Sequence, residues 1–198
     1  MLSQPEVEHR LAPFLPIIQR VILEAWRDWM ESGKNGRWKR KRSRANYMWE
    51  ELACRAEAAF SAHPHVHIHH KTQSCWFVIE GVVYRFKKSD AKGLSKNYPT
   101  QAALDYHDQQ QDLPGIPLTQ RLETTYVLNK LETAIQDILL VARDAERVLW
   151  CSSILHRDEG GTVVPFTSHP QTTPPATPAK TIKIPVKSAR IEKNENES

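Results

Sequence analysis

The sequence contains few cysteines and no long apolar run. Cys54, Cys75 and Cys151 are far apart among the 198 residues and form no CxxC pair. This spacing indicates neither a disulfide framework nor a zinc knuckle. No stretch approaches the roughly 18 apolar residues of a membrane span, and the N-terminus lacks the pattern of a signal peptide. We therefore expect a soluble, cytoplasmic protein that does not associate with membranes.

Familiar catalytic signatures are absent as well. The chain has no HExxH, no serine nucleophile elbow and no phosphate-binding glycine loop. Metal-dependent nucleases of the restriction-enzyme type need an acid and a Glu-x-Lys on adjacent strands, but Glu80 and Lys87 are seven residues apart. The catalytic residues are therefore unknown, whether the protein is an enzyme stays open, and no cofactor is predicted.

The positive charge is concentrated in one short segment. The formal net charge is +4, but residues 33–44 hold seven cations and no acid, so the rest of the chain is net acidic. A distribution of this kind says more about binding partners than the total does. Phosphates bind such cations, and Trp38 offers a ring on which a base can stack. We predict nucleic-acid binding by Arg37, Trp38, Lys39, Arg40, Lys41, Arg42 and Arg44, with a solvated loop between two helices as the alternative.

Helices are predicted on both sides of this segment. Apolar residues recur at steps of three and four from Glu6 to Met30, which is helical spacing. Pro13 and Pro16 limit the regular helix to about Leu15–Glu31. The same pattern returns over Ala45–Ala62.

From His65 onward the apolar period becomes two, which is typical of β-strands. Two strands flank the hairpin signal Glu80-Gly81, and a further strand, a charged turn and a second hairpin follow. A short helix with Thr100 as its cap is predicted between them. The stretch Leu131–Leu140 also has helical spacing, so a helix there stays open. The predicted elements are strands near 65–70, 75–80, 82–88, 122–128, 138–142 and 147–154, and a helix at 100–111.

These elements predict an α+β fold. We expect an antiparallel sheet of about five or six strands with the N-terminal helices packed on one face. A single domain would cover residues 1–155. Residues 156–198 are rich in proline, threonine and lysine and poor in large apolar residues, so we predict a disordered tail.

The histidine-rich stretch HPHVHIHH is a candidate metal site. Strand alternation would place His65, His67 and His69 on one face, where imidazoles are plausible zinc or nickel ligands. Residues two apart on a strand are about 7 Å apart, too far for three to share one ion without ligands from elsewhere. We therefore predict an exposed strand face and no metal site, with a metal site as the alternative.

The stretch VVYRFKKSDAKGLSKNYPTQ begins as a strand and ends in a polar loop. Its cations, hydroxyls and amides would gather at the strand end beside the start of a helix, which favours anions. A loop longer than its connection needs is often functional. The alternative is an ordinary capped loop. We predict a loop that binds an anionic target through Arg85, Lys87, Lys88, Asp90, Ser95, Asn97, Thr100 and Gln101.

The residues YRFKKSDAKGLSKNYPTQAALDY and YVLNKLETAIQDILLVARDAERVLW resemble a poorly characterised bacterial family. Its members are encoded beside antitoxins that join a helix-turn-helix to an ImmA/IrrE-type metallopeptidase domain. The resemblance covers about Leu15–Ile154, and the basic segment and the histidine strand do not match it. It extends to the motif residues Arg85, Lys87, Lys88, Gly93, Ser95, Asn97, Pro99, Thr100 and Gln101, without giving their chemical roles.

The resemblance implies the toxin of a toxin–antitoxin or phage-defence pair, neutralised by a protein partner encoded nearby. Its target would be anionic, with a nucleic acid as a candidate. The alternative is a non-catalytic nucleic-acid-binding module that uses the basic segment.

Overall fold

The computed structural model describes residues 2–71, 74–95, 101–109 and 120–155, all within the first of the chain's two units, Met1–Pro165. The tail predicted for 156–198 lies outside the described residues, as do Asn97 and Thr100. No helix in the described part of the chain combines the length and the apolar character that a membrane crossing requires.

The N-terminal part, up to Phe60, is helical. Helix α1 (Gln4–Leu11) leads through a short 3-10 turn, η1 (Ala12–Phe14), into α2 (Leu15–Glu31). Proline fits the first turn of a helix because no backbone hydrogen bond is lost there, which explains why α2 begins beside Pro16. Helices α3 (Lys34–Arg37) and α4 (Lys41–Phe60) follow. The predicted bounds of α2 are confirmed, whereas α4 begins four residues before the predicted Ala45.

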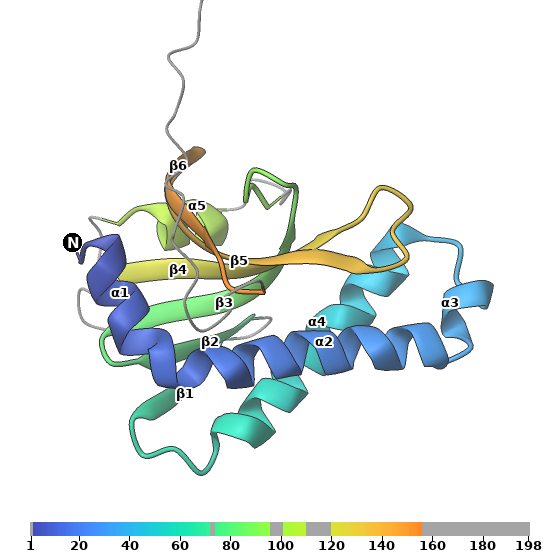
Figure 1. Ribbon diagram of the computed structural model, residues 1–198, viewed down its shortest axis with the longest axis horizontal. Coiled ribbons are helices and arrows are strands. Elements are labelled where there is room, and N and C mark those ends of the chain that lie inside the picture. Colours follow the sequence, from blue (N-terminus) through green and yellow to red (C-terminus); the bar gives the residue numbers. More distant parts are fainter. Residues whose placement is uncertain (1, 72–73, 96–100, 110–119, 156–198) are drawn as a thin grey trace, which may run out of the picture. The chain divides into compact units, whose positions relative to one another are not determined.

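The remaining elements build a six-stranded sheet in the order β1-β2-β3-β4-β5-β6. An α+β fold with N-terminal helices on one sheet face is therefore confirmed (Figure 1). The strands are β1 (Val66–Lys71), β2 (Ser74–Ile79), β3 (Val82–Ser89), β4 (Gln120–Leu128), β5 (Ile135–Asp144) and β6 (Arg147–Ser153), with helix α5 (Gln101–His107) between β3 and β4.

The sheet is mixed, which corrects the expectation of a purely antiparallel one. Strands β3 and β4 pair in parallel, and every other neighbouring pair is antiparallel. A two-residue hairpin can only reverse the chain, whereas parallel neighbours need a long crossover connection. The segment between Ser89 and Gln120, which contains α5, provides that crossover.

The two sheet faces bury different side chains. Alternate residues of β3, such as Tyr84 and Phe86, join the main core under α2 and α4. The residues between them face α5, where Tyr106 packs on Trp76 and Val83. The sheet is therefore covered on both faces, and α5 is the one described helix on the second face.

The turns agree with their local sequences. Glu80 and Gly81 have φ angles of 48° and 75°, the left-handed pair that a tight β2–β3 hairpin requires. The open alternative at Leu131–Leu140 is resolved as well, because Ile135–Asp144 forms strand β5 and pairs with both neighbours. The hairpin between β4 and β5 reaches the start of α4, where Glu132 meets Arg44.

Candidate anion-binding site

The basic segment is exposed and leads directly into a helix. Six of its seven cations are exposed, and Arg44 is half-buried. The Nζ atom of Lys34 lies 5.4 Å from the ring centroid of Trp38 and 4.8 Å from that of Tyr47. Trp38 packs on the buried Trp29 yet stays 44% exposed. The segment thus presents cations beside an indole ring that solvent can reach.

The start of α4 contradicts the usual rule for helix ends. A helix N-terminus carries a partial positive charge, so acids stabilise it and cations do not. The first turn of α4 contains no acid, and the preceding Arg40 makes no side-chain cap. Lys41, Arg42 and Arg44 instead add positive charge to this end. Local rules are commonly broken at functional sites, where another requirement outweighs helix stability.

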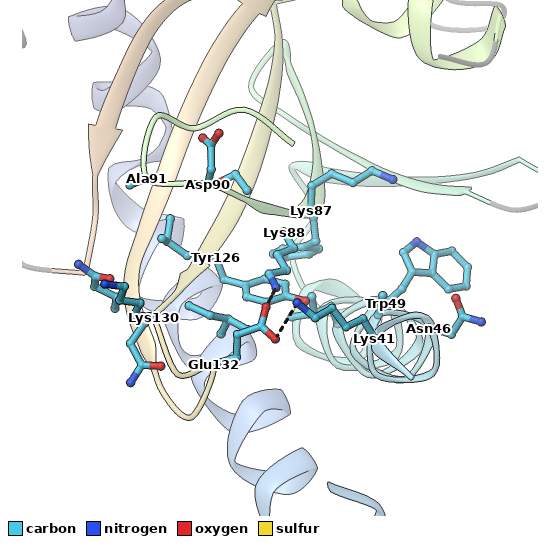
Figure 2. Close-up of a pocket in the computed structure, with 18 residues that line it drawn as sticks. Lys41, Asn46, Trp49, Lys87, Lys88, Asp90, Ala91, Tyr126, Lys130 and Glu132 are labelled. Carbon is cyan, nitrogen blue, oxygen red and sulfur yellow. Dashed lines mark hydrogen bonds and ion pairs between the residues drawn. The ribbon is translucent and has the colours of Figure 1, made fainter. Parts of the chain in front are cut away.

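A cavity of about 860 Å³ adjoins this helix start. Its walls come from the first three turns of α4, the ends of β3 and β4, and the β4–β5 turn (Figure 2). Two sets of residues that the sequence analysis treated separately meet here, since Lys41 belongs to the basic segment and Lys87, Lys88 and Asp90 belong to the strand-end loop. Trp49 and Tyr126 contribute aromatic surface. The charged residues of the wall are Lys41, Lys87, Lys88, Asp90, Lys130 and Glu132.

Glu132 neutralises part of this positive charge. Its carboxylate accepts hydrogen bonds of 2.7 Å from Arg44 Nη2 and from Lys88 Nζ, and Lys41 Nζ lies 3.7 Å away. These hydrogen bonds, first that of Arg44 and then that of Lys88, lower the pKa of Glu132 to about 2. Its φ of 54° is unusual for a residue with a side chain. Figure 2 shows its carboxylate between Lys88 and Lys41.

The strand-end loop residues lie on both faces of the sheet. Lys88 faces Glu132, whereas Arg85 and Lys87 point to the α5 face. Lys87 is half-buried at the cavity rim, and burial, followed by the charge of Arg85, lowers its pKa. The carboxylate of Asp90 accepts hydrogen bonds from the backbone amides of Lys92 and Leu94, which is a turn-building role.

Arg85 and Ser95 are buried and paired inside the protein, each with 8% exposure. Arg85 binds Oε1 of Glu123 through Nε at 3.2 Å and Nη2 at 2.8 Å, and Ser95 Oγ donates to Oε2 at 2.7 Å. Arg143 Nη1 lies 3.4 Å from Oε2. Burial alone would raise the pKa of Glu123, but the charge of Arg85 and the hydroxyl of Ser95 lower it.

His107 completes this buried cluster in its neutral form. Arg85 Nη2 lies 2.9 Å from His107 Nε2, and a guanidinium can only donate, so Nε2 accepts. Burial, outweighing the nearby Glu123, lowers the pKa of His107 to about 4. The 3.4 Å contact of Nε2 with Glu123 is therefore not an ion pair at neutral pH. We call Arg85, Ser95, His107, Glu123 and Arg143 the internal ionic cluster.

Gln101 is exposed and its amide donates to Asp105 one turn along α5. Asn97 and Thr100 lie outside the described residues, so their target contacts stay predictions, as do those of Arg85 and Ser95. The histidines of the HPHVHIHH stretch have separate surroundings: His65 lies beside Glu80, His67 is exposed, and His69 stacks on Trp76.

Sequence reasoning missed the acids that organise both sites. Glu123 lies 38 residues from Arg85 and Glu132 lies 88 residues from Arg44. A charged residue inside the apolar strand pattern of 122–128 was the available signal for Glu123, because such a residue is buried only with a partner. No local signal marked Glu132. Other residues of the cavity and the cluster were missed as well, among them Trp49, His107, Tyr126, Lys130 and Arg143.

No protein-family model, curated protein or solved structure matches the chain. Its function is therefore inferred from the geometry of these sites and from the residues of the motif.

Proposed function

We propose that this protein binds the phosphate backbone of a nucleic acid along the start of α4 and in the adjoining cavity. We propose further that this binding is the target-recognition step of a cytoplasmic toxin or phage-defence effector. A neighbouring gene product would neutralise it.

The observation that carries the binding proposal is the first turn of α4, which holds Lys41, Arg42 and Arg44 and no acid, with Lys41 in the cavity wall. Cations at the positive end of a helix weaken the helix. Glu132 pairs with Lys41 and Arg44, whereas the described residues show no acidic partner for Arg42. An anion would be attracted both by these side chains and by the positive end of the helix dipole. Lys88 and Lys130 extend the positive surface across the cavity.

The aromatic residues favour a single strand over a duplex. Trp38 is 44% exposed beside the cations, and Trp49 is half-buried in the cavity wall. Unpaired bases stack on such rings while the phosphates contact lysine and arginine. The bases of a duplex already stack on one another, so they are not accessible to these rings. A cavity of about 860 Å³ also lies in the range of sites that hold a small molecule or a nucleotide.

The binding test is the salt dependence of affinity for a fluorescent single-stranded oligonucleotide, measured by anisotropy. The variant R40A/K41A/R42A should bind far more weakly than the wild type. The slope of log K against log salt should fall by about 0.7 for each lost phosphate contact. A matched control, R20A/R27A/R147A, removes three exposed arginines from other surfaces.

Two outcomes would refute the binding proposal. The first is wild-type affinity in R40A/K41A/R42A. The second is an equal loss in the control, which would show a general effect of net charge rather than a site. A duplex that binds more tightly than the single strand would refute the stacking role of Trp38 and Trp49.

The toxin role is supported by the motif RFKK...G.S.N.PTQ and has its own test. Induction of the gene alone should arrest bacterial growth, and coexpression of the adjacent gene should relieve the arrest. If the cation surface recognises the target, R40A/K41A/R42A should accumulate as folded protein without stopping growth. Normal growth of cells that hold soluble wild-type protein would refute this role.

A further inference from the structure

We propose that Glu57, His70 and Cys75 form a binding site for a zinc ion. This site is separate from the cavity, and the proposal does not depend on the proposed function. It also differs from the metal site considered for His65, His67 and His69, since none of those residues takes part.

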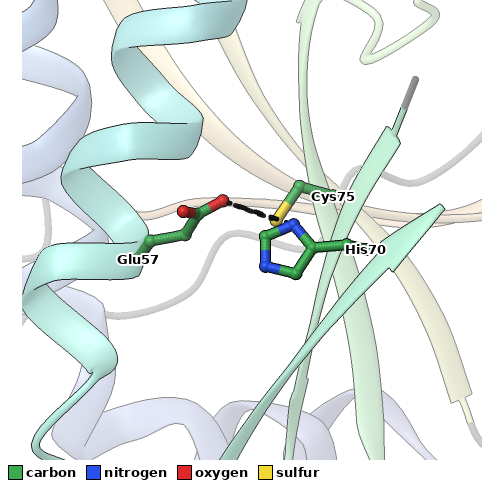
Figure 3. Close-up of side chains that lie close together, drawn as sticks. All are labelled: Glu57, His70 and Cys75. Carbon is green, nitrogen blue, oxygen red and sulfur yellow. Dashed lines mark hydrogen bonds and ion pairs between the residues drawn. The ribbon is translucent and has the colours of Figure 1, made fainter. Parts of the chain in front are cut away.

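The three residues converge from three different elements. His70 of β1 and Cys75 of β2 are directly opposite each other in the antiparallel register, and Glu57 reaches them from α4 (Figure 3). Strand alternation explains why His70, and not the neighbouring His69, belongs to the site. His69 points to the α5 face and stacks on Trp76, whereas the next residue, His70, points to the helical face.

The distances between the donor atoms suit tetrahedral coordination. Zinc bonds of about 2.0–2.3 Å to oxygen, nitrogen and sulfur place neighbouring ligand atoms about 3.3–3.7 Å apart. Cys75 Sγ lies 3.5 Å from Glu57 Oε1, and His70 Nδ1 lies 3.7 Å from the same oxygen. All three donor atoms are within 4.8 Å of one another. A small adjustment of the exposed His70 ring would bring the three to one ion.

The Cys75 thiol already donates a hydrogen bond to the Glu57 carboxylate, so a sulfur and an acidic oxygen face each other without an ion. A divalent ion would take the place of the thiol proton and compensate both a thiolate and the carboxylate. Cys75 is 9% exposed and belongs to the core, which gives the site a fixed inner ligand. The His70 and Glu57 side chains are 65% and 36% exposed and leave a path for the ion.

The ligand set selects zinc among common cellular ions. A thiolate and an imidazole are poor ligands for magnesium and calcium, which prefer oxygen, whereas zinc accepts sulfur, nitrogen and oxygen together. Three protein ligands leave the fourth zinc position for water or another ligand. The bound ion would tie the second half of α4 to the edge of the sheet.

The test uses the full chain, stripped of metal by chelator and dialysed. Zinc affinity is measured by competition with a chromogenic chelator, and cobalt is then added as a spectroscopic substitute. The wild type should bind one zinc ion with a dissociation constant below about 1 μM. Its cobalt form should show thiolate-to-cobalt charge-transfer absorption. H70A and E57Q should each weaken zinc binding about 10- to 100-fold, and C75S should also remove the charge-transfer absorption.

Matched controls separate this site from general binding by histidines and thiols. H67A removes an exposed histidine of the same strand, and C151S removes a thiol on β6. Both should keep wild-type zinc affinity. A substitution of Cys75 can also disturb the core. H70A is therefore the decisive variant, because the His70 side chain is exposed and its removal does not disturb packing. Wild-type zinc affinity in H70A, an equal loss in H67A, or no binding by the wild type at 10 μM zinc would each overturn the proposal.

Discussion

Two groups of cations in this molecule have the same chemistry and opposite surroundings. Arg85 and Arg143 of the internal ionic cluster are largely buried and share the fully buried carboxylate of Glu123. The cations of the basic segment are mostly exposed. Within the described residues, Glu132 pairs with both Lys41 and Arg44 at the cavity wall.

The comparison shows that the number of cations in a stretch does not identify a binding surface. The motif around Arg85 is as conspicuous in sequence as the basic segment, yet Arg85 and Ser95 are buried and bind Glu123. The cations at the start of α4 are unfavourable for the end of their own helix, although Glu132 pairs with Lys41 and Arg44. Loss of stability should therefore mark the first group, and loss of ligand binding the second.

Removal of Glu123 should produce the largest effect. E123A leaves Arg85 and Arg143 buried without a counter-charge, which costs about 3–5 kcal/mol in the free energy of unfolding. Urea denaturation measures this change. The free energy of unfolding of R40A/K41A/R42A should stay close to that of the wild type, because substitutions of exposed residues usually change stability by about 0.5 kcal/mol or less. If E123A lowers the free energy of unfolding no more than R40A/K41A/R42A does, the two groups of cations do not differ in their contribution to stability.

Acid should destabilise the internal ionic cluster through His107. Its pKa is lowered to about 4 in the folded state, so between pH 6.5 and 4 the unfolded chain binds a proton that the folded chain excludes. Stability is therefore present in full above pH 6.5 and falls as the pH drops toward 4, by roughly 2–3 kcal/mol. Melting temperatures of the wild type and H107Q across this range measure the effect. The wild type should lose more stability than H107Q, and parallel curves would contradict the prediction.

Gly93 should be sensitive to a single added methyl group. Its φ is 79°, and a Cβ there would lie 2.9 Å from Val141 Cγ2 and 3.3 Å from Cys151 Sγ. G93A should therefore cost about 1–3 kcal/mol through strain and overpacking. G36A is the matched control, since no atom lies within 4 Å of its added Cβ and its φ is not left-handed. Equal stability of the two variants in thermal unfolding would show that the loop relaxes freely.

Replacement of Glu132 should have a small effect on stability and should raise, not lower, oligonucleotide affinity. E132Q removes partly exposed ion pairs, which are worth about 1 kcal/mol or less. The same change frees Arg44, Lys88 and Lys41, so oligonucleotide affinity should rise severalfold at low salt. Glu146 is an exposed acid in the β5–β6 turn, and E146Q should raise the oligonucleotide affinity less. Weaker binding by E132Q would contradict the placement of the anion in this cavity.

Much of the fold was predictable because its signals are local. Pro13, Pro16 and Gly33 bounded α2 correctly, and Glu80-Gly81 marked a real hairpin. The start of α4 was predicted too late, since a run of cations is unfavourable at a helix start and gives no helical signal. The parallel pairing of β3 and β4 was also missed, because strand patterns do not encode the direction of a neighbour that lies beyond a long connection.

The sequence by itself determined the helical stripe, the alternation of the strands and the position of the basic segment. Each follows from residues within a few positions of one another, whose spacing sets which side chains share a face. Only the tertiary structure decided that Glu123 pairs with Arg85, that Glu132 faces Lys88, and that Glu57 meets His70 and Cys75. Such pairings depend on which distant segments pack together to bury the most apolar surface, and that depends on the whole chain.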